Sequence, residues 1–268
     1  MKPRLLLLTN TDNSSPEEDK YLADFLRDIF DVTRVHPRDA GEFEDVADLI
    51  LVRNIWPTET QLPELHAMYA RFARKNLCVY NPFIGHGDMQ GKKYLPELWR
   101  LGYPVIPSVE RVSELGALPL TENFMVKPLF GGSSFGVKKI ARSKLEAMPL
   151  TDHIIQPFLQ IEKEISFYFI DNELQHVLAT RGDRWNLQFY DATDEQKMIA
   201  QNFVQWNSLP RGIQRIDFAL TFDGEFLLME IEDWCPFLSL RGLDAARSAL
   251  FFEAIRGALL RAIFFAND

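Results

Sequence analysis

The sequence contains little cysteine and no long apolar run. Its two cysteines, Cys78 and Cys235, are too few for a disulfide scaffold, which favours a reducing, cytoplasmic location. Leu5–Leu8 resembles the core of a signal peptide, but polar residues follow it at once. No segment approaches the roughly 18 apolar residues of a membrane span, and we see no internal repeat or long Gly/Ser linker. We therefore expect a soluble, cytoplasmic protein.

Basic residues are also in the minority. The chain has 29 Lys and Arg against 38 Asp and Glu, which gives a formal charge of −9. This balance argues against duplex nucleic acid or an anionic membrane surface as a main partner. Hydrophobic residues make up 47 % of the chain and charged residues 25 %, which is typical of a globular protein with a full core. The 268 residues are enough for one large or two modest domains.

Two common phosphate-binding motifs are missing from the one Gly-rich segment, Gly131–Gly136. It is not a P-loop, because Val137 stands where the lysine is required, and its glycines do not match G-x-G-x-x-G. The segment still offers backbone N–H groups and two hydroxyls, with Lys127 before it and Lys138 after it. A loop of this kind is able to wrap a polyphosphate, and a plain hairpin turn is the alternative. No Ser/His/Asp spacing indicates a hydrolase triad.

The first ninety residues predict a small parallel α/β domain, because apolar runs alternate there with amphipathic segments. The apolar runs predict four strands: Leu5–Leu8, Val32–Val35, Leu49–Val52 and Leu77–Tyr80. The segments near 17–29 and 61–75 predict helices, and Ser15 and Pro16 would cap the first of them. Ligands gather at the carboxyl ends of parallel strands. Asn10 and Arg53 follow two of these strands and are candidate substrate contacts, with ordinary loop caps as the alternative.

The segment Arg215–Glu232 predicts a β-hairpin. Asp223-Gly224 between two apolar runs is a signal for a two-residue turn. With that turn, Asp217 lies directly opposite Glu230, and Glu232 points from the same face. Like charges at such positions destabilise a sheet unless a cation compensates them. Oxygen-only ligands suit Mg²⁺, which commonly binds together with a nucleotide phosphate. Neutralisation by Arg215 or another arginine, or a register slip of one residue, is the alternative.

Taken together, these features resemble the ATP-grasp superfamily, nearest in layout to glutathione synthetase and related carboxylate–amine ligases. The resemblance covers about Lys92 to Ser239 and rests on the order of its parts: Lys92 or Lys93, Lys127, the Gly-rich loop, Gln156-Pro157-Phe158-Leu159, Glu164, Arg181 and the acidic hairpin. It implies an α/β and α+β chain. An ATP-grasp fold of two α+β subdomains over residues 89–268, hinged near 156–160, would follow a parallel α/β substrate domain over residues 1–88.

The resemblance also implies residue roles. Lys92 and Lys127 would contact the phosphates of ATP, and the loop would close over them. Gln156, with the Phe158–Leu159 backbone, would read the adenine edge, Glu164 would bind the ribose, and Met229 would pack on the purine. Arg181, together with Lys127, would stabilise the transferring phosphoryl group. The remaining implied contacts are the loop residues Gly131, Gly132, Ser133, Ser134, Phe135, Gly136 and Val137, and Asp217, Glu230 and Glu232 as ligands of one or two Mg²⁺ ions.

The function implied is an ATP- and Mg-dependent ligase that joins a carboxylate to an amine through an acyl-phosphate, on amino-acid or small peptide-like substrates. A kinase of the same fold and a nucleotide-binding module without ligase activity are the alternatives, and a homodimer is common in the family. Glu232 departs from the family, which usually has Asn there. Substrate contacts are expected from Asn10, Arg53, Arg184, Asn186 and Arg241.

Overall fold

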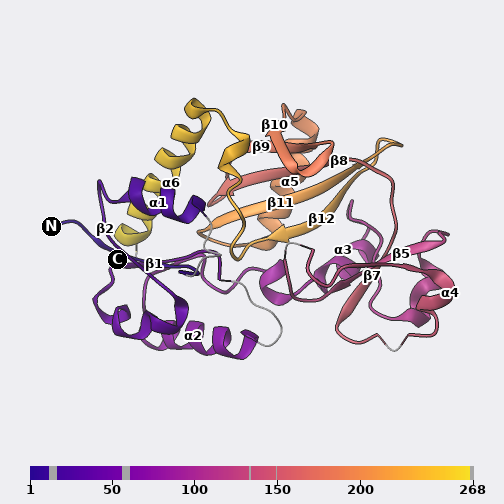
Figure 1. Cartoon of the computed structure of the whole chain (residues 1–268), viewed down its shortest axis with the longest axis horizontal. Helices are drawn as coiled ribbons and strands as arrows, with labels where there is room; N and C mark the ends of the chain where they lie inside the picture. The colour runs from indigo at the N-terminus through magenta and orange to yellow at the C-terminus, as the bar shows by residue number, and fades with distance from the viewer. Residues whose placement is uncertain (12–16, 56–60, 133, 149, 266–268) are drawn as a thin grey trace.

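The computed structural model describes residues 1–11, 17–55, 61–132, 134–148 and 150–265. Three β-sheets follow one another along this chain, one parallel and two antiparallel (Figure 1). The predicted cap at Ser15 and Pro16 lies outside the described residues. Short 3₁₀ helices join the larger elements: η1 (Pro37–Glu42), η2 (Glu44–Val46), η4 (Asp88–Gln90), η5 (Val112–Ala117) and η6 (Leu240–Gly242).

The first sheet is the predicted parallel α/β unit. Its strands lie in the order β2-β1-β3-β4, with bounds β1 (Arg4–Leu8), β2 (Asp31–Val35), β3 (Leu49–Val52) and β4 (Val79–Tyr80). Alternate residues of β1 enter different clusters: Leu5 packs with helix α1 (Glu17–Leu26), and Leu6 packs with helix α2 (Leu62–Arg74). Both faces of the sheet are therefore covered, which explains why its central strands are continuous apolar runs.

The second sheet is small and antiparallel, in the order β6-β5-β7. Its strands are β5 (Asn123–Pro128), β6 (Lys138–Ala141) and β7 (His153–Pro157), accompanied by helices α3 (Tyr94–Arg100) and α4 (Arg142–Leu145). Phe124 and Val126 of β5 pack with Leu145 of α4 in a separate cluster. The Gly-rich loop connects β5 to β6 and so lies at one end of this sheet.

The third sheet is the largest, with order β10-β9-β8-β11-β12. Its strands are β8 (Ile161–Ile170), β9 (Glu173–Arg181), β10 (Asp183–Phe189), β11 (Ile213–Thr221) and β12 (Phe226–Glu232), and helix α5 (Asp194–Asn207) accompanies them. Phe167 and Phe218, from adjacent strands, pack edge to face against each other, and both belong to the same core cluster as Phe203 of α5. The two antiparallel sheets with their helices match the two α+β subdomains that the sequence predicts.

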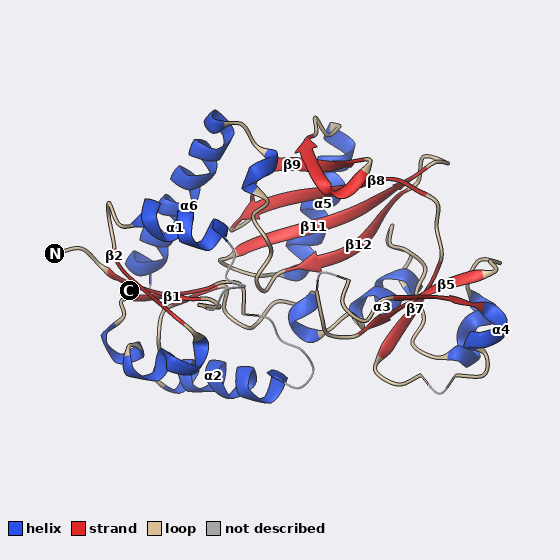
Figure 2. Ribbon diagram, in the orientation of Figure 1, coloured by secondary structure: helices blue, strands red, loops and turns tan. Residues whose placement is uncertain are grey.

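Long-range contacts join the third sheet and the segment after it to the first sheet and its helices. Helix α6 (Ala245–Phe265) ends the described chain and yet packs beside α1, where Phe251 enters the same cluster as Leu5 (Figures 1 and 2). Just after β4, the buried amide of Asn81 donates to the carbonyls of Ile213 at 2.8 Å and Asp233 at 2.9 Å. The end of β12 is therefore held against the parallel sheet.

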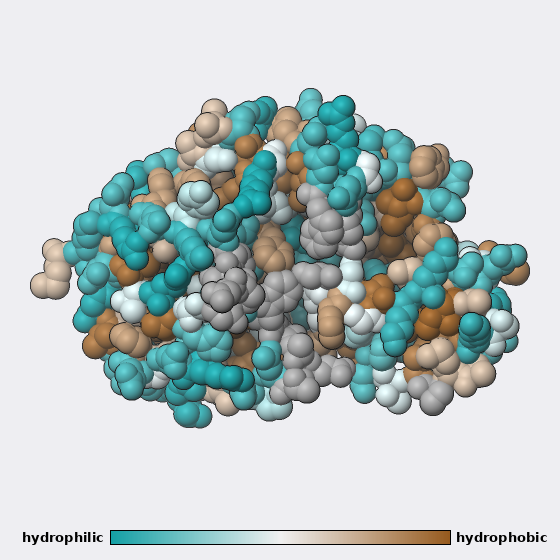
Figure 3. Space-filling model, viewed as in Figure 1, coloured by the Kyte–Doolittle hydropathy of each residue, from teal (hydrophilic) through white to brown (hydrophobic). Residues whose placement is uncertain are grey.

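The visible surface is mainly hydrophilic, with apolar residues in scattered patches (Figure 3). Helix α6 is the longest helix and is largely apolar, but within the described residues none has the length and hydropathy that a membrane span requires.

His176 is an unusual buried group in this core. Its ring stacks on Tyr168 at a centroid distance of 4.4 Å, and its Nε2 atom has no hydrogen-bond partner. Burial lowers the pKa of His176 from 6.5 to about 4. The native state therefore keeps this imidazole neutral, while the unfolded chain takes up a proton below about pH 6.5.

We expect this difference to remove up to about 3 kcal/mol of stability as the pH falls from 6.5 to 4. Denaturant unfolding at pH 7 and pH 4.5 measures the loss, and His176→Gln is expected to lose less stability than the wild type over that interval. An equal loss in the two proteins would contradict this account of His176.

Candidate functional site

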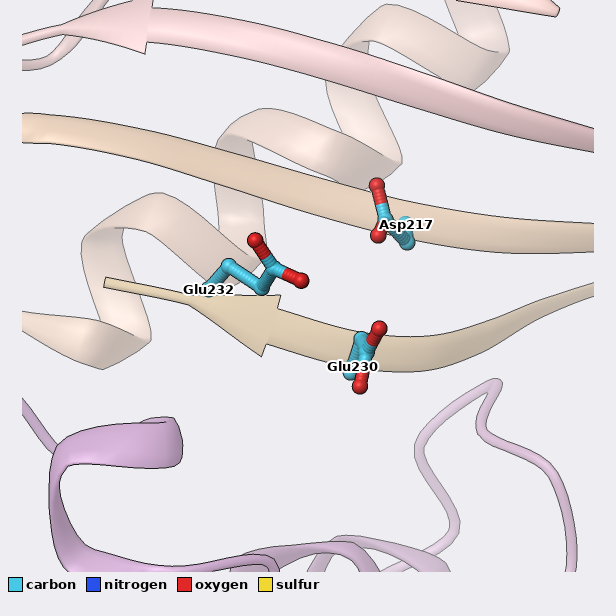
Figure 4. A group of neighbouring side chains, drawn as sticks. All are labelled: Asp217, Glu230 and Glu232. Atoms are coloured by element: carbon cyan, nitrogen blue, oxygen red, sulfur yellow. The ribbon is translucent and has the colours of Figure 1, made fainter. Parts of the chain in front are cut away.

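The β11–β12 hairpin brings three carboxylates together. Asp217 pairs directly with Glu230, and Glu232 lies two residues further along β12. One oxygen from each of the three side chains lies within 4.8 Å of the others (Figure 4). The sequence predicted this group, and oxygen-only donors at such spacing suit a hard cation such as Mg²⁺.

The predicted turn of this hairpin is wrong, although the predicted pairing of Asp217 with Glu230 is confirmed. Thr221, not Phe222, pairs with Glu225, so the loop has three residues and ends in Gly224 with a φ of +84°. A bulge at Met229 then restores the register, because Phe218 pairs with Leu228 while Asp217 pairs with Glu230. The two irregularities cancel, and the acidic residues keep a common face.

Arg215 neutralises two of these carboxylates. Its Nε lies 2.9 Å from Oδ1 of Asp217, and its Nη2 lies 2.7 Å from Oε1 of Glu232. The position of Arg215 beside these carboxylates follows from the strand register, since Arg215 pairs with Glu232 across the hairpin. This is the neutralising arginine that the sequence left open as an alternative. Its planar fork holds both carboxylates in fixed positions.

The third carboxylate is balanced by lysines. Nζ of Lys92 lies 3.1 Å from Oε2 of Glu230 and also bonds to Asp88. Burial raises the pKa of Glu230, but the charges of Lys92, Lys127 and Arg215 outweigh it and lower the pKa to about 2. Glu230 is therefore ionised at every physiological pH.

Asp88 and Tyr94 orient Lys92, and sequence reasoning missed both. The Tyr94 hydroxyl donates to Oδ1 of Asp88 at 2.8 Å and accepts the N–H of Ile231 at 2.7 Å. The chain Ile231–Tyr94–Asp88–Lys92 thus ties the lysine to strand β12, which carries Glu230 and Glu232. The spacing of four residues between Asp88 and Lys92 was the available signal, but neither residue lies in an α-helix that would give that spacing meaning.

A cavity of about 250 Å³, the inner cavity, lies between the two antiparallel sheets and the Gly-rich loop. It is lined by most of the residues that the resemblance assigns to ATP: Lys92, Lys127, Gly131, Gly132, Ser134, Phe135, Val137, Gln156, Phe158, Leu159, Glu164 and Met229. Gly136 does not line it, and Ser133 lies outside the described residues. Burial lowers the pKa of Lys127, and the negative charge of Glu230 partly offsets this decrease.

The Gly-rich loop adopts positive φ angles that glycine permits. Gly136 has a φ of +75°, and a Cβ there would meet Cγ of Pro128 at 2.8 Å. Phe135 at the tip is 77 % exposed. One implied contact needs correction: the N–H of Phe158 already donates to the carbonyl of Asn123 at 3.0 Å, so it is not available to read a base edge.

A second, larger cavity of about 910 Å³, the large cleft, adjoins the acidic hairpin. Ser134, Glu164, Met229 and Glu230 line both this cleft and the inner cavity, so the two spaces meet at the carboxylates. From there the large cleft extends to the start of α1 and to η6.

Asn186 and Arg241 line the large cleft, as expected of substrate contacts, and the exposed Arg241 pairs with Glu17. Asn10 instead lines a separate cavity at the ends of the parallel strands. The side chain of Arg184 lies outside the described part of the chain.

Arg53 requires a correction. It was expected to bind a substrate carboxylate, but its side chain is fully buried and engaged by the protein. Its Nε lies 3.1 Å from Oδ1 of Asp19, its Nη1 donates to the carbonyl of Pro236 at 2.8 Å, and its Nη2 lies 3.1 Å from Oε1 of Glu18. Burial of an arginine demands such partners, and here they give it a structural position.

Arg181 lies at the exposed end of β9, where its Nη1 donates to Gln188 at 3.0 Å. It does not line the inner cavity or the large cleft, whereas Arg215 lines the large cleft.

No family model matches the sequence, and no curated protein matches it. Solved structures do match the fold over nearly the whole of both chains. D-cycloserine synthetase DcsG has a TM-score of 0.73 at 21 % identity, covering 95 % of this chain and 99 % of its own. D-alanine–D-alanine ligase from Bacillus anthracis, complexed with ATP, has a TM-score of 0.69 at 15 % identity, covering 97 % and 98 %.

A third structure carries the name of the fold itself. The ATP-grasp ligase PsnB, complexed with a minimal precursor, has a TM-score of 0.67 at 15 % identity and covers 98 % of this chain and 100 % of its own. With its parallel sheet, two antiparallel sheets and intervening cavity, the chain has the ATP-grasp fold.

Proposed function

We propose that this protein is an ATP- and Mg-dependent ligase that joins a carboxylate to an amine. One observation carries the proposal: a cavity lined by two lysines and a Gly-rich loop opens at Glu230 into a large cleft. A nucleotide in the first space would therefore direct its terminal phosphate toward a substrate in the second. The DcsG, PsnB and D-alanine–D-alanine ligase structures share this fold and support the ligase class.

The residues of the inner cavity suit ATP. Lys92 and Lys127 would neutralise its phosphates, and the loop at 131–137 would close over them and exclude water. Glu164, which lines both cavities, is suited to bind the ribose hydroxyls, and Met229 offers an apolar surface for the purine.

Asp217, Glu230 and Glu232 would hold Mg²⁺, since they offer only oxygen ligands and lie within reach of one ion. Bound there, one or two ions would neutralise charge on the ATP phosphates. Occupancy by a cation would release Arg215 from part of its pairing. Its guanidinium would then be free to contact the transferring phosphoryl group.

The reaction has two steps. An oxygen of the substrate carboxylate attacks the γ-phosphorus of ATP, which gives an acyl-phosphate and releases ADP. The amine nitrogen then attacks the acyl carbon, phosphate leaves with the C–O bonding pair, and the nitrogen loses a proton to give the amide. The protein contributes position and charge neutralisation in both steps, and loop closure protects the acyl-phosphate from water.

The substrates proposed are amino acids or small peptide-like molecules. A cleft of about 910 Å³ has room for a carboxylate substrate and an amine substrate together. Asn186 and Arg241 are the described candidate contacts in its outer part.

ADP release with pooled amino acids and dipeptides tests the proposal directly. A ligase releases ADP over many turnovers only when the carboxylate substrate and the amine are both present, or when hydroxylamine replaces the amine and traps the acyl-phosphate as a hydroxamate. The carboxylate substrate alone gives at most one ADP per enzyme. ADP release with a stable phosphorylated product and no need for an amine indicates a kinase, and no release with any pool counts against ligase activity.

Glu230→Gln is expected to lower the rate of ADP release at least a hundredfold while leaving the fold intact. The amide has nearly the same volume as the carboxylate but removes the charge that pairs with Lys92 and would bind the metal. Glu225→Gln, at an exposed position next to the loop of the same hairpin, is the matched control and should keep full activity. Wild-type turnover in Glu230→Gln would overturn the metal assignment.

Arg215→Lys and Arg181→Lys decide which arginine contacts the phosphoryl group. We expect Arg215→Lys to reduce kcat at least a hundredfold with less than a threefold change in ATP affinity, because lysine keeps the charge but lacks the planar fork. Arg181→Lys is expected to retain turnover, since Arg181 lies exposed outside both cavities. The reverse result would assign the role to Arg181.

A further inference from the structure

A buried serine holds the side chain of Gln156. Nε2 of Gln156 donates to Oγ of Ser108 at 2.8 Å, and both residues are almost fully buried, with exposures of 1 % and 0 %. A bridge between Val109 and Ile155 fixes the two segments side by side, through backbone hydrogen bonds of 3.0 and 2.8 Å. Ser108 and Gln156 are the residues next to this bridge, so their contact is set by the backbone.

The serine also fixes which end of the amide faces it. A hydroxyl has one proton, and Ser108 donates it to the carbonyl of Ile106 at 2.7 Å. Its oxygen can then only accept toward Gln156, which requires the amide nitrogen on that side. The opposite end of the amide, Oε1, is therefore an acceptor. If the amide turned over, its hydrogen bond to Ser108 would be lost, unless the Ser108 hydroxyl gave up its bond to the Ile106 carbonyl and donated to Gln156 instead.

The side chain of Gln156 leaves the sheet on the face of the inner cavity. Gln156 pairs directly with Met125 of β5, and directly paired residues project from the same face of a sheet. Met125 and Lys127, two residues apart on β5, both line the inner cavity, as does Gln156 itself. The amide oxygen is thus an acceptor on the cavity face of the sheet, beside Met125.

We propose that Ser108 is a specificity-determining, positioning residue: it holds Gln156 so that the inner cavity accepts a purine with a 6-amino group and rejects one with a 6-oxo group. This inference rests on the proposed function only in that the cavity binds a purine nucleotide. Adenine offers an N6–H donor to Oε1, whereas hypoxanthine and guanine present an acceptor at the same position. Two acceptors facing one another cost about one hydrogen bond.

The test is the binding of ATP and inosine triphosphate to the purified full chain, measured by calorimetry with Mg²⁺ present. We expect the wild type to prefer ATP at least tenfold. In Ser108→Ala the amide is free to turn over and donate to a 6-oxo group, so the preference should fall about tenfold, the value of one neutral hydrogen bond. Ser113→Ala, an exposed serine on η5, is the matched control and should keep the wild-type preference.

A double variant separates positioning from a general structural effect. S108A/Q156E carries a carboxylate, which only accepts hydrogen bonds, so the preference for ATP should return although the serine is absent. S108C keeps the volume with a weak hydrogen-bonding group and should lose the preference like Ser108→Ala, which covers the case that the alanine variant does not fold.

An unchanged ATP preference in Ser108→Ala and S108C, or no recovery in S108A/Q156E, would overturn the role of Ser108 while leaving ATP binding in place. Equal binding of both nucleotides by the wild type would also overturn it. If the wild type bound neither nucleotide, the proposed function would fail first, so the two failures are distinguishable.

Discussion

The site depends on one electrostatic constraint: three carboxylates share one partly buried face of the β11–β12 hairpin and must be neutralised. Arg215 pairs with two of them and Lys92 pairs with the third, so the carboxylates hold the basic side chains of the site in position. In a region of low dielectric an unpaired charge would cost several kcal/mol. The same arrangement suits a nucleotide, because lysines that balance carboxylates in its absence are able to bind phosphates when a cation takes their place.

The parallel domain supports this hairpin at a distance. Asn81 holds the carbonyl of Asp233, and Glu18 accepts the N–H groups of Leu238 and Ser239, at 2.9 and 3.1 Å. The segment that leaves β12 toward the large cleft is thus held at one end by Asn81, which follows β4, and at the other by Glu18 of helix α1. Arg53, which the sequence suggested as a substrate contact, serves this purpose through Pro236. The domain therefore shapes the cleft by positioning its wall.

Local patterns predicted much of the fold because they act over short distances. Apolar runs predicted β1 and β3, and the Asp-Gly pair predicted a hairpin with Asp217 opposite Glu230. The turn was wrong by one residue, because a three-residue loop and a bulge at Met229 give the same pairing as a two-residue turn without a bulge. Pattern alone does not distinguish these, since both keep the acids on one face.

What the sequence by itself determined is the set of groups with local logic: the acidic hairpin, the Gly-rich loop and the lysine on β5, whose positions follow from strand alternation and turn chemistry. Only the tertiary structure decided their partners. Ser108 lies 48 positions from Gln156, and Arg53 lies 183 positions from Pro236. Such contacts depend on how sheets and helices pack, and no local pattern records them. The physical reason is that a buried polar group needs a partner, but packing chooses which one.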